Sequence, residues 1–515
     1  MKRQVFKDYQ QSQSMLLPPN LEELIPEGHL CRTLNEMINK LDRNILEAQY
    51  KGGGTSAYDP QMMLKVIIYA YTQRIFTSRQ IAKALRENVN FMWLSGMNRP
   101  DFRTINRFRT KVMKAVIDEV FYGIIEQLLE MGLIDMQSYF MDGTKIEANA
   151  NKYSFVWRKS TQTHKSKLQE KVQALLEQID ELEAEEEQEY EERDLNEVRE
   201  GKEIDSEKLN EVMEKINRRL EQDTDNKDLK SVKKRIEKDF LPRMKKYEAY
   251  EEIFIERNSF SKTDPDATFM RMKEDAMKNG QLKAGYNVQL GTQNQYILGY
   301  SLHQRPGDTM CMQEHLEKLY EHMGRYPKDL IADAGYGSEE NYAWLQEKNI
   351  EAYVKYNSFH YEKKRNYKKK HSYRADAFIY HAEEDEYECP EGKQLSFEKE
   401  RNRTTENCYE SKRKIYRCVD CTACPVREQC CKGKGNRQIA IGTELEKYRQ
   451  AASDRLESEE GQRYRSKRPV EVEAVFGRLK QNWGFRRFIL RGIENVSTEW
   501  GILSVAHNIA KVAAA

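Results

Sequence analysis

Apolar residues recur every three or four positions over the first quarter of the chain, as they do on one face of a helix. This spacing predicts a helix over residues 29–41, and the apolar run that starts at Pro60 predicts a buried one. We expect Ser78 to cap a further helix over residues 79–85. The helix pair at residues 60–87 fits either a helix-turn-helix DNA reader or a plain helical bundle.

The stretch from residue 99 to residue 109 places four arginines at the start of another predicted helix. Arg103 and Arg107 are among them, and arginines in this arrangement can contact the phosphate backbone of nucleic acid. The alternative is an ordinary solvated helix face. We therefore expect a helical N-terminal domain over residues 1–132, with Arg103 and Arg107 as candidate DNA contacts.

A heptad pattern begins after residue 160 and is typical of a coiled coil. Its first seam consists of Leu168, Val172, Leu175, Ile179 and Leu182, and two shorter seams follow before residue 240. Such segments fold back as an antiparallel helical hairpin, so we expect residues 160–259 to form an inserted coiled-coil arm. The acidic run at 183–192 disfavours phosphate contact and leaves dimer contact or spacing as the expected role.

The hydrophobic pattern changes from helical to alternating beyond residue 264. Residues 284–290 and 295–300 predict paired strands around a turn at 291–294. Further on, a short strand at Leu330-Ile331 precedes a predicted helix over 339–348. Strands that alternate with helices predict an α/β fold.

We expect this fold to be assembled from three separate parts of the chain. They are residues 133–159, 260–358 and 446–515, and the last part ends in an apolar helix over 496–512. The arm interrupts the first junction, and a cysteine-rich, basic insertion over 359–445 interrupts the second.

Composition narrows the class of protein. Hydrophobic residues make up 39% and charged residues 33%, which allows real cores under a large solvated surface. The net charge is +1, so only local basic runs, such as the one at 363–370, suggest contact with phosphate. We expect a soluble, cytoplasmic protein, since there is no apolar signal segment and no run near the roughly 20 apolar residues that span a bilayer.

Most of the nine cysteines lie between residues 389 and 431. Disulfides are not expected in a reducing compartment. The spacing C-x2-C-x2-C-x5-C, with one cysteine upstream, is typical of a closed, structural Zn²⁺ site with thiolate ligands. The expected ligands are Cys389, Cys421, Cys424 and Cys430, with Cys418 as a substitute, and free buried thiols are the alternative.

Two carboxylates stand where a short apolar run gives way to glycine. Asp142 precedes Gly143, and Asp333 lies two residues before Gly335, so each is expected at the end of a strand. Asp142-Gly143 alone also fits a surface turn. A third carboxylate, Glu473, borders the buried stripe of a predicted helix.

Three such carboxylates suit phosphodiester chemistry. Two Mg²⁺ or Mn²⁺ ions, roughly 4 Å apart, can activate the attacking oxygen and stabilise the leaving one. We expect Asp142 to bridge both ions, and Asp333 and Glu473 to complete one ion each. Glu471 is the rival of Glu473, and Lys480 is a candidate to hold the DNA backbone.

These motifs resemble those of the DDE transposases of bacterial insertion sequences. The resemblance is carried by Asp142-Gly143-Thr144, by Ala332-Asp333-Ala334-Gly335-Tyr336, and by Val472-Glu473 with Phe476-Gly477-Arg478-Leu479-Lys480. It implies an RNase H-like catalytic core with the triad Asp142, Asp333 and Glu473. The N-terminal region and the cysteine-rich insertion also match members of this group.

The resemblance also implies an activity. Such an enzyme binds the terminal inverted repeats of its own element, cleaves the DNA ends as an endonuclease by two-metal hydrolysis, and joins the 3′-hydroxyl ends to target DNA. It would act on the bacterial nucleoid as at least a homodimer, because two ends must be held together. The alternatives are a nuclease of the same fold that cuts without joining, and a catalytically inactive DNA-binding protein.

Many members of the group carry the signature Y-x2-R-x3-E-x6-K. Glu473 and Lys480 keep the spacing of its second half. Arg468 lies one residue further from Glu473 than the signature asks, Tyr464 is shifted as well, and Lys467 competes for the role of the arginine.

Aromatic and basic side chains alternate after the predicted catalytic helix. Trp483 belongs to this stretch and can either stack on an unpaired base or pack in the core. Together with Arg478, Arg468 and Tyr464, it completes the candidate DNA contacts.

Overall fold

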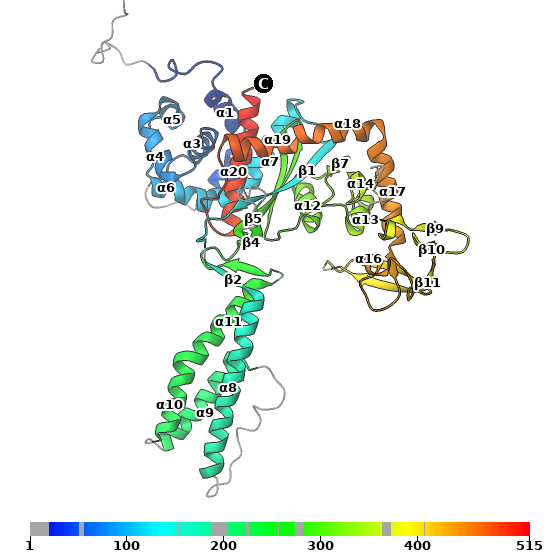
Figure 1. Cartoon of the computed structure of the whole chain (residues 1–515). Helices are drawn as coiled ribbons and strands as arrows, with labels where there is room; N and C mark the ends of the chain where they lie inside the picture. Colours follow the sequence, from blue (N-terminus) through cyan, green and yellow to red (C-terminus); the bar gives the residue numbers. More distant parts are fainter. Residues whose placement is uncertain are drawn as a thin grey trace, which may run out of the picture.

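A computed structural model gives the architecture of the chain. It describes residues 20–50, 56–152, 154–186, 204–222, 226–255, 257–272, 282–362, 372–405 and 407–515. A helical region and a mixed sheet form the body, a helical arm projects from one side, and a small sheet lies at the far end (Figure 1). The basic run at 363–370 lies outside the described residues, as do the side chains of the acidic run at 183–192.

The N-terminal region is helical, as predicted. Its elements are α1 (Leu30–Asn39), α2 (Arg43–Glu47), α3 (Pro60–Thr72), α4 (Ser78–Glu87), α5 (Val89–Leu94), α6 (Phe102–Arg107), the π-helix η1 (Phe108–Met113) and α7 (Lys114–Glu130). Helix α3 is buried along most of its length, and the side chain of Asp59 caps it by accepting from the Met62 amide at 2.9 Å. Helix α4 is capped by Thr77 and not by Ser78, because Thr77 Oγ1 accepts from the Gln80 amide.

The central sheet is mixed. Its strands are β1 (Ser138–Glu147), β4 (Thr268–Arg271), β5 (Leu282–Gln293), β6 (Tyr296–His303), β7 (Asp329–Ala332) and β8 (Glu351–Val354). The order is β6-β5-β1-β7-β8, with β4 also paired to β5; β5 runs antiparallel to β1, β4 and β6, whereas β7 and β8 run parallel to β1. The predicted α/β fold is thereby confirmed.

The β5–β6 turn lies later than the sequence predicted. It falls at Asn294 and Gln295, whose φ angles are 50° and 61°, the left-handed values of a tight two-residue hairpin. Gly291, which we expected in the turn, lies within β5 instead.

The remaining helical elements of the body pack around the sheet or follow its strands in the chain. These elements are the 3₁₀ turn η4 (Thr309–Cys311), α12 (Met312–Met323), α13 (Glu339–Glu347), α17 (Thr443–Glu457), α18 (Glu459–Lys467), the 3₁₀ turn η6 (Arg468–Val470), α19 (Val472–Gly477), the π-helix η7 (Arg478–Asn482) and α20 (Ile493–Val512). Helix α20 is almost entirely buried and packs against α3, α7 and β6. One hydrophobic core therefore runs from the N-terminal helices through the sheet to α20.

A buried polar cluster joins the two ends of the chain in this core. Glu499 of α20 accepts a hydrogen bond from the Tyr71 hydroxyl at 3.3 Å, and Arg109 donates to the same hydroxyl at 3.1 Å. Glu499 also accepts from the amides of Ile489 and Leu490. Burial raises the pKa of the Glu499 carboxyl, and the charge of Arg109 opposes that rise.

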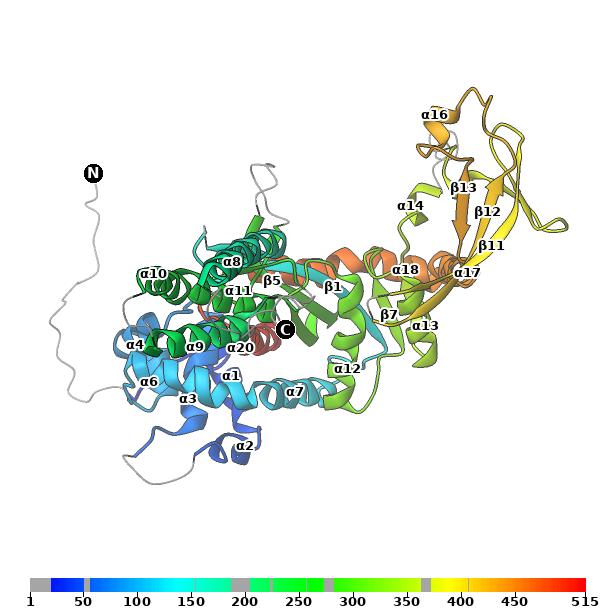
Figure 2. The ribbon, with the colours of Figure 1, turned by 90° about the horizontal axis from the view of Figure 1, so that it is seen from below.

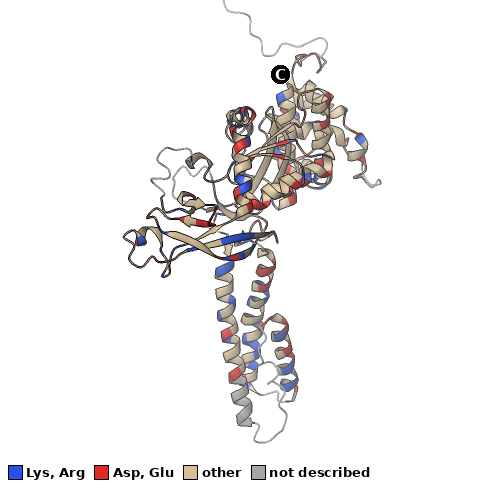
Figure 3. Ribbon diagram, turned by 90° about the vertical axis from the view of Figure 1, so that its right-hand side faces the viewer, with Lys and Arg blue, Asp and Glu red and all other residues tan. Residues whose placement is uncertain are grey.

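The arm has its own core, as the heptad pattern indicated. It leaves the body through a ribbon of β2 (Phe155–Trp157) and β3 (Ser259–Ser261) and contains α8 (Arg158–Glu186), α9 (Ser206–Gln222), α10 (Lys227–Arg235), the π-helix η3 (Ile236–Phe240) and α11 (Leu241–Phe254). Helix α9 packs beside α10 and α11, so the arm is a bundle of three rods and not the predicted two-rod hairpin (Figure 1). Basic and acidic residues intermix along it (Figure 3).

The cysteine-rich insertion contains a sheet that the sequence analysis did not predict. Its antiparallel strands are β9 (Ile379–His381), β10 (Glu386–Glu388), β11 (Gln394–Thr404), β12 (Glu410–Cys418) and β13 (Gln438–Ile441), with the short helices α14 (Phe359–Glu362) and α16 (Arg427–Cys430) and the 3₁₀ turn η5 (Ala375–Ala377) nearby. The sheet extends away from the body beyond α17 (Figure 2). Its own core is small.

Across the described parts of the chain, none of the helices combines the length and apolar character that a membrane-spanning segment needs.

Candidate active site

Asp142, Asp333 and Glu473 line one pocket, although they are far apart in the sequence. The pocket has a volume of about 340 Å³. Its other lining residues are Thr144, Arg468, Phe476, Gly477, Lys480 and Gln481.

The register of the sheet brings the two aspartates together. Strands β1 and β7 are parallel neighbours in which Phe140 pairs with Ile331. Asp142 and Asp333 each lie two residues beyond that pair, so they reach the same level of the sheet. Asp333 directly follows β7, as predicted.

The expectation that β1 ends at Asp142 was wrong. The strand continues through Gly143 to Glu147, because β5 pairs with it along this whole length. Asp142 therefore lies in the middle of a buried strand, which also excludes the surface turn.

Helix α19 supplies Glu473. Val472, Val475 and Phe476 are buried, as is Leu479 in the π-helix η7 that follows, and this stripe fixes the helix against the sheet. The Glu473 side chain is 50% exposed and borders the pocket. Glu471 instead accepts a hydrogen bond from the Gln295 amide at 2.8 Å, and burial raises its pKa. Glu473 therefore lines the pocket, whereas Glu471, the alternative ligand, is hydrogen-bonded to Gln295 instead.

Arg468 contacts all three carboxylates. Its Nη2 atom lies 3.2 Å from Oδ2 of Asp142 and 3.8 Å from Oδ2 of Asp333, and Nη1 lies 3.0 Å from Oε1 of Glu473. The Arg468 side chain is 10% exposed. One guanidinium therefore occupies the point where the carboxylates converge.

Other cations surround this point. Lys480 is buried and donates through Nζ to Oγ1 of Thr144 at 3.1 Å. Thr144 shares the Asp142 face of β1, since side chains alternate along a strand. Lys355, just after β8, has a pKa lowered by burial and then by the charge of Arg468.

Three predicted DNA contacts lie in other surroundings. Tyr464 is buried, and its hydroxyl donates to Oδ2 of Asp329, at the opposite end of β7 from Asp333. Trp483 is buried with its ring 6.2 Å from that of His507, and Arg478 lies 5.6 Å above its face. Tyr464 and Trp483 therefore have the surroundings of core side chains.

Arg103 and Arg107 line a different pocket, on the N-terminal helices, with a volume of about 530 Å³. The guanidinium groups of Arg79 and Arg103 lie 5.2 Å and 5.7 Å from the Phe102 ring. The pocket is also lined by Asn106 and Lys111. Basic and aromatic side chains thus share one open surface on the helices α4 and α6.

Sequence reasoning missed a polar network on the opposite face of β1. The Asp308 carboxylate accepts from the amides of Asn287 at 2.7 Å and Gln289 at 2.9 Å, and the Tyr336 hydroxyl donates to Gln289 Oε1. Asn287 and Gln289 are fully buried in β5. These two polar residues, which alternate with the apolar Tyr286, Val288 and Leu290, were the available signal.

This network explains why a glycine follows Asp142. A Cβ atom at Gly143 would lie 2.5 Å from both Asp308 Oδ1 and Gln289 Nε2. Tyr336, in the turn that carries Asp333, belongs to the same network. Gly143 therefore permits a support that holds the two aspartate-bearing segments in register.

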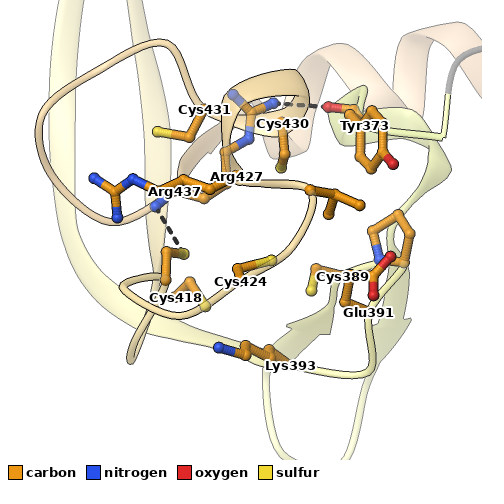
Figure 4. A pocket seen from close by; sticks show the side chains of 13 residues that line it. Tyr373, Cys389, Glu391, Lys393, Cys418, Cys424, Arg427, Cys430, Cys431 and Arg437 are labelled. Atoms are coloured by element: carbon orange, nitrogen blue, oxygen red, sulfur yellow. Dashed lines mark hydrogen bonds between the residues drawn. The ribbon is translucent and has the colours of Figure 1, made fainter.

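Six cysteines line one small cavity of about 20 Å³, which can hold one water-sized particle (Figure 4). They are Cys389, Cys418, Cys421, Cys424, Cys430 and Cys431. Burial raises the pKa of the Cys418 thiol to about 11, and the neighbouring Cys421 thiol adds to the rise. The Sγ atom of Cys431 lies 3.5 Å from the Gly435 carbonyl oxygen. Cys408 is exposed and does not line this cavity.

Within the described residues, no three His, Cys, Asp or Glu side chains stand ready, as they are, to hold a metal ion. The donor set of the carboxylate pocket nevertheless fits hard divalent cations, which prefer oxygen ligands. A positive group, the Arg468 guanidinium, already stands where such an ion would bind.

Comparison with known families identifies the class. A family model described as a transposase DDE domain matches residues 388–513, which include Glu473, and one described as a transposase domain (DUF772) matches residues 19–111. Two separate segments of the chain are therefore similar to transposase domains, one of them a DDE domain. Both matches support an assignment to the DDE transposases of insertion sequences, the group that the motifs resemble. No curated protein and no solved structure matches the chain.

Gly143→Ala should destabilise the protein by about 1–3 kcal/mol, because the added methyl group overpacks the network around Asp308. Urea denaturation would measure the loss. Gly477→Ala is the matched control: its Cβ has nothing within 4 Å, so stability should hold or rise by about 0.5–1 kcal/mol. Equal stability of Gly143→Ala and the unmodified protein would contradict the account of this glycine.

Proposed function

We propose that this transposase binds the terminal inverted repeats of its own element, cleaves the DNA ends by metal-dependent hydrolysis, and joins the 3′-hydroxyl ends to target DNA. The observation that carries the proposal is the convergence of Asp142, Asp333 and Glu473 on one pocket. The strand order supports it, since three antiparallel strands followed by two parallel ones form the sheet of an RNase H-like core.

The three carboxylates would hold two Mg²⁺ or Mn²⁺ ions. Held by these carboxylates, such ions would supply activation of the attacking oxygen and stabilisation of the leaving oxygen in an in-line displacement. Asp142 would be a ligand of both ions, because it lies on the central strand of the sheet. Lys480, which donates to Thr144 beside Asp142, would bind a phosphate oxygen at the same pocket. Hydrolysis and joining then differ only in the attacking group, which is water in the first case and a 3′-hydroxyl in the second.

The N-terminal helices would bind the DNA at a site separate from the catalytic pocket. Arg103 and Arg107 line an open basic pocket in the segment that matches a transposase domain. Arg478 remains a candidate at the catalytic end, whereas the burial of Tyr464 and Trp483 leaves them out of the proposed interface. Holding two DNA ends requires at least a homodimer, and the place of action would be the bacterial nucleoid.

We also propose a structural Zn²⁺ in the cysteine cavity. The predicted ligands Cys389, Cys421, Cys424 and Cys430 line it together, and Cys418 stays an alternative because it lines the same space. The small core of this sheet supports the proposal, since domains with little buried apolar area commonly need a metal.

Glu473→Gln should lower DNA cleavage at least about a hundredfold, because it removes a metal ligand. The assay incubates the protein with paired element ends, a plasmid target and Mg²⁺. Glu471→Gln, the same change two residues away, should cleave normally. Full activity of Glu473→Gln would refute the site; cleavage without joined product would favour a nuclease, and binding without cleavage an inactive DNA-binding protein.

Arg103→Ala combined with Arg107→Ala should weaken DNA binding across all sequences. The slope of log K against log salt should shrink by about 1–2, since each lost phosphate contact contributes about 0.9. Fluorescence anisotropy over a salt series would measure this. Lys83→Ala, which removes an exposed lysine of α4 outside the pocket, should keep the slope; an unchanged slope in the double variant would exclude this pocket as a phosphate site.

Elemental analysis should find one zinc per purified chain. Cys421→Ser and Cys424→Ser should each lose the zinc and lower the melting temperature, whereas Cys408→Ser should retain both because Cys408 is exposed outside the cavity. Purified protein without zinc would refute the metal and leave the cysteines as free thiols.

A further inference from the structure

We propose that Arg468 is a built-in counter-cation: its guanidinium occupies the carboxylate pocket in the free protein, keeps metal affinity low, and leaves when DNA binds. This inference rests on the proposed function, because it concerns how the same three carboxylates acquire their ions.

The contacts of Arg468 carry the inference. Each of the three carboxylates gives one oxygen to this guanidinium, at 3.0, 3.2 and 3.8 Å. Those carboxylates are also the oxygen ligands proposed for the divalent ions. A guanidinium at their meeting point and a doubly charged ion would compete for the same negative charge, and they would repel each other at such short range. Arg468 and the ions are therefore alternatives in the same space.

Arg468 is held there by charge more than by hydrogen bonds. Its side chain is 10% exposed, yet within the described part of the chain Nε and Nη2 have no hydrogen-bond partner. The Nη1 atom does donate to Glu473. A guanidinium that served only as a permanent structural tie would be expected to have its buried donors satisfied. The hold of the pocket on Arg468 therefore rests mainly on ion pairs, which another anion can replace.

A DNA phosphate offers that better position. Phosphate accepts two parallel hydrogen bonds from a guanidinium, in a geometry that matches its planar fork. Lys480 and Gln481 line the same pocket, so a phosphate bound beside them would also be near Arg468. When Arg468 turns to the phosphate, the three carboxylates become available to metal.

The exchange makes DNA and metal binding cooperative. Each ligand favours the state in which Arg468 has left the carboxylates, so each must raise the affinity of the other by the same factor. The free protein would then resist loading with metal, and cleavage would wait until DNA is in place.

Mn²⁺ binding to the full-length protein without DNA tests the proposal, with the free-ion electron paramagnetic resonance signal as readout. Arg468→Gln should bind Mn²⁺ at least about tenfold more tightly than the unmodified protein. Arg463→Gln is the matched control: it removes a charge from the neighbouring helix α18, where the side chain is 61% exposed and pairs with Glu460, and it should leave the affinity unchanged. Equal or weaker binding by Arg468→Gln would overturn the proposal.

A second measurement uses the unmodified chain and does not depend on the folding of the variant. Adding a mixed-sequence DNA duplex, with binding to the duplex alone subtracted, should tighten Mn²⁺ binding at least about tenfold. The gain should be smaller in Arg468→Gln, because its carboxylates are already free. An equal gain in both proteins would overturn the exchange. If none of the proteins binds Mn²⁺ with or without DNA, the metal site of the proposed function itself fails.

Discussion

Three carboxylates can share one pocket only if a cation stands between them. Two like charges about 4 Å apart repel by about 4 kcal/mol at an effective dielectric constant of about 20, and three such charges would push the pocket apart. Arg468 supplies the cation in this chain, with one contact to each carboxylate. The convergence of Asp142, Asp333 and Glu473 thus depends on compensated charge as much as on apolar packing.

The same logic explains how distant parts of the chain are joined. Helix α20 lies in the segment that matches a DDE domain and packs on α3, in the segment that matches the other transposase domain. Glu499 and Arg109 both hydrogen-bond to the Tyr71 hydroxyl in that contact, and the charge of Arg109 opposes the rise of the Glu499 pKa that burial causes. Under the proposed function, DNA bound at the basic pocket of the N-terminal helices would be attached to the same core that carries the carboxylates. The arm and the cysteine-rich sheet each have a separate core and extend from this body.

Much of the fold could be predicted from the sequence, because the spacing of apolar residues indicates which face of a helix or strand is buried. The helices around Pro60 and Glu473, the strand before Asp333 and the separate core of the arm all followed from apolar spacing. The end of β1 could not be predicted, because Gly143 answers a close approach by Asp308, which is distant in sequence. Arg468 had only an imperfect motif spacing, and its contact with three carboxylates depends on a turn that the pattern does not reveal. Strand β11, the longest of the cysteine-rich sheet, is polar and exposed along most of its length, so it lacks the apolar alternation that predicts a strand.

Anomalous diffraction from a crystal of the protein with bound DNA, soaked with Mn²⁺, would locate both the ions and the Arg468 guanidinium. Manganese peaks are expected between the carboxyl groups of Asp142, Asp333 and Glu473, with the Arg468 guanidinium turned away toward a phosphate. Manganese bound elsewhere, or an Arg468 still paired with all three carboxylates beside bound DNA and metal, would contradict this expectation.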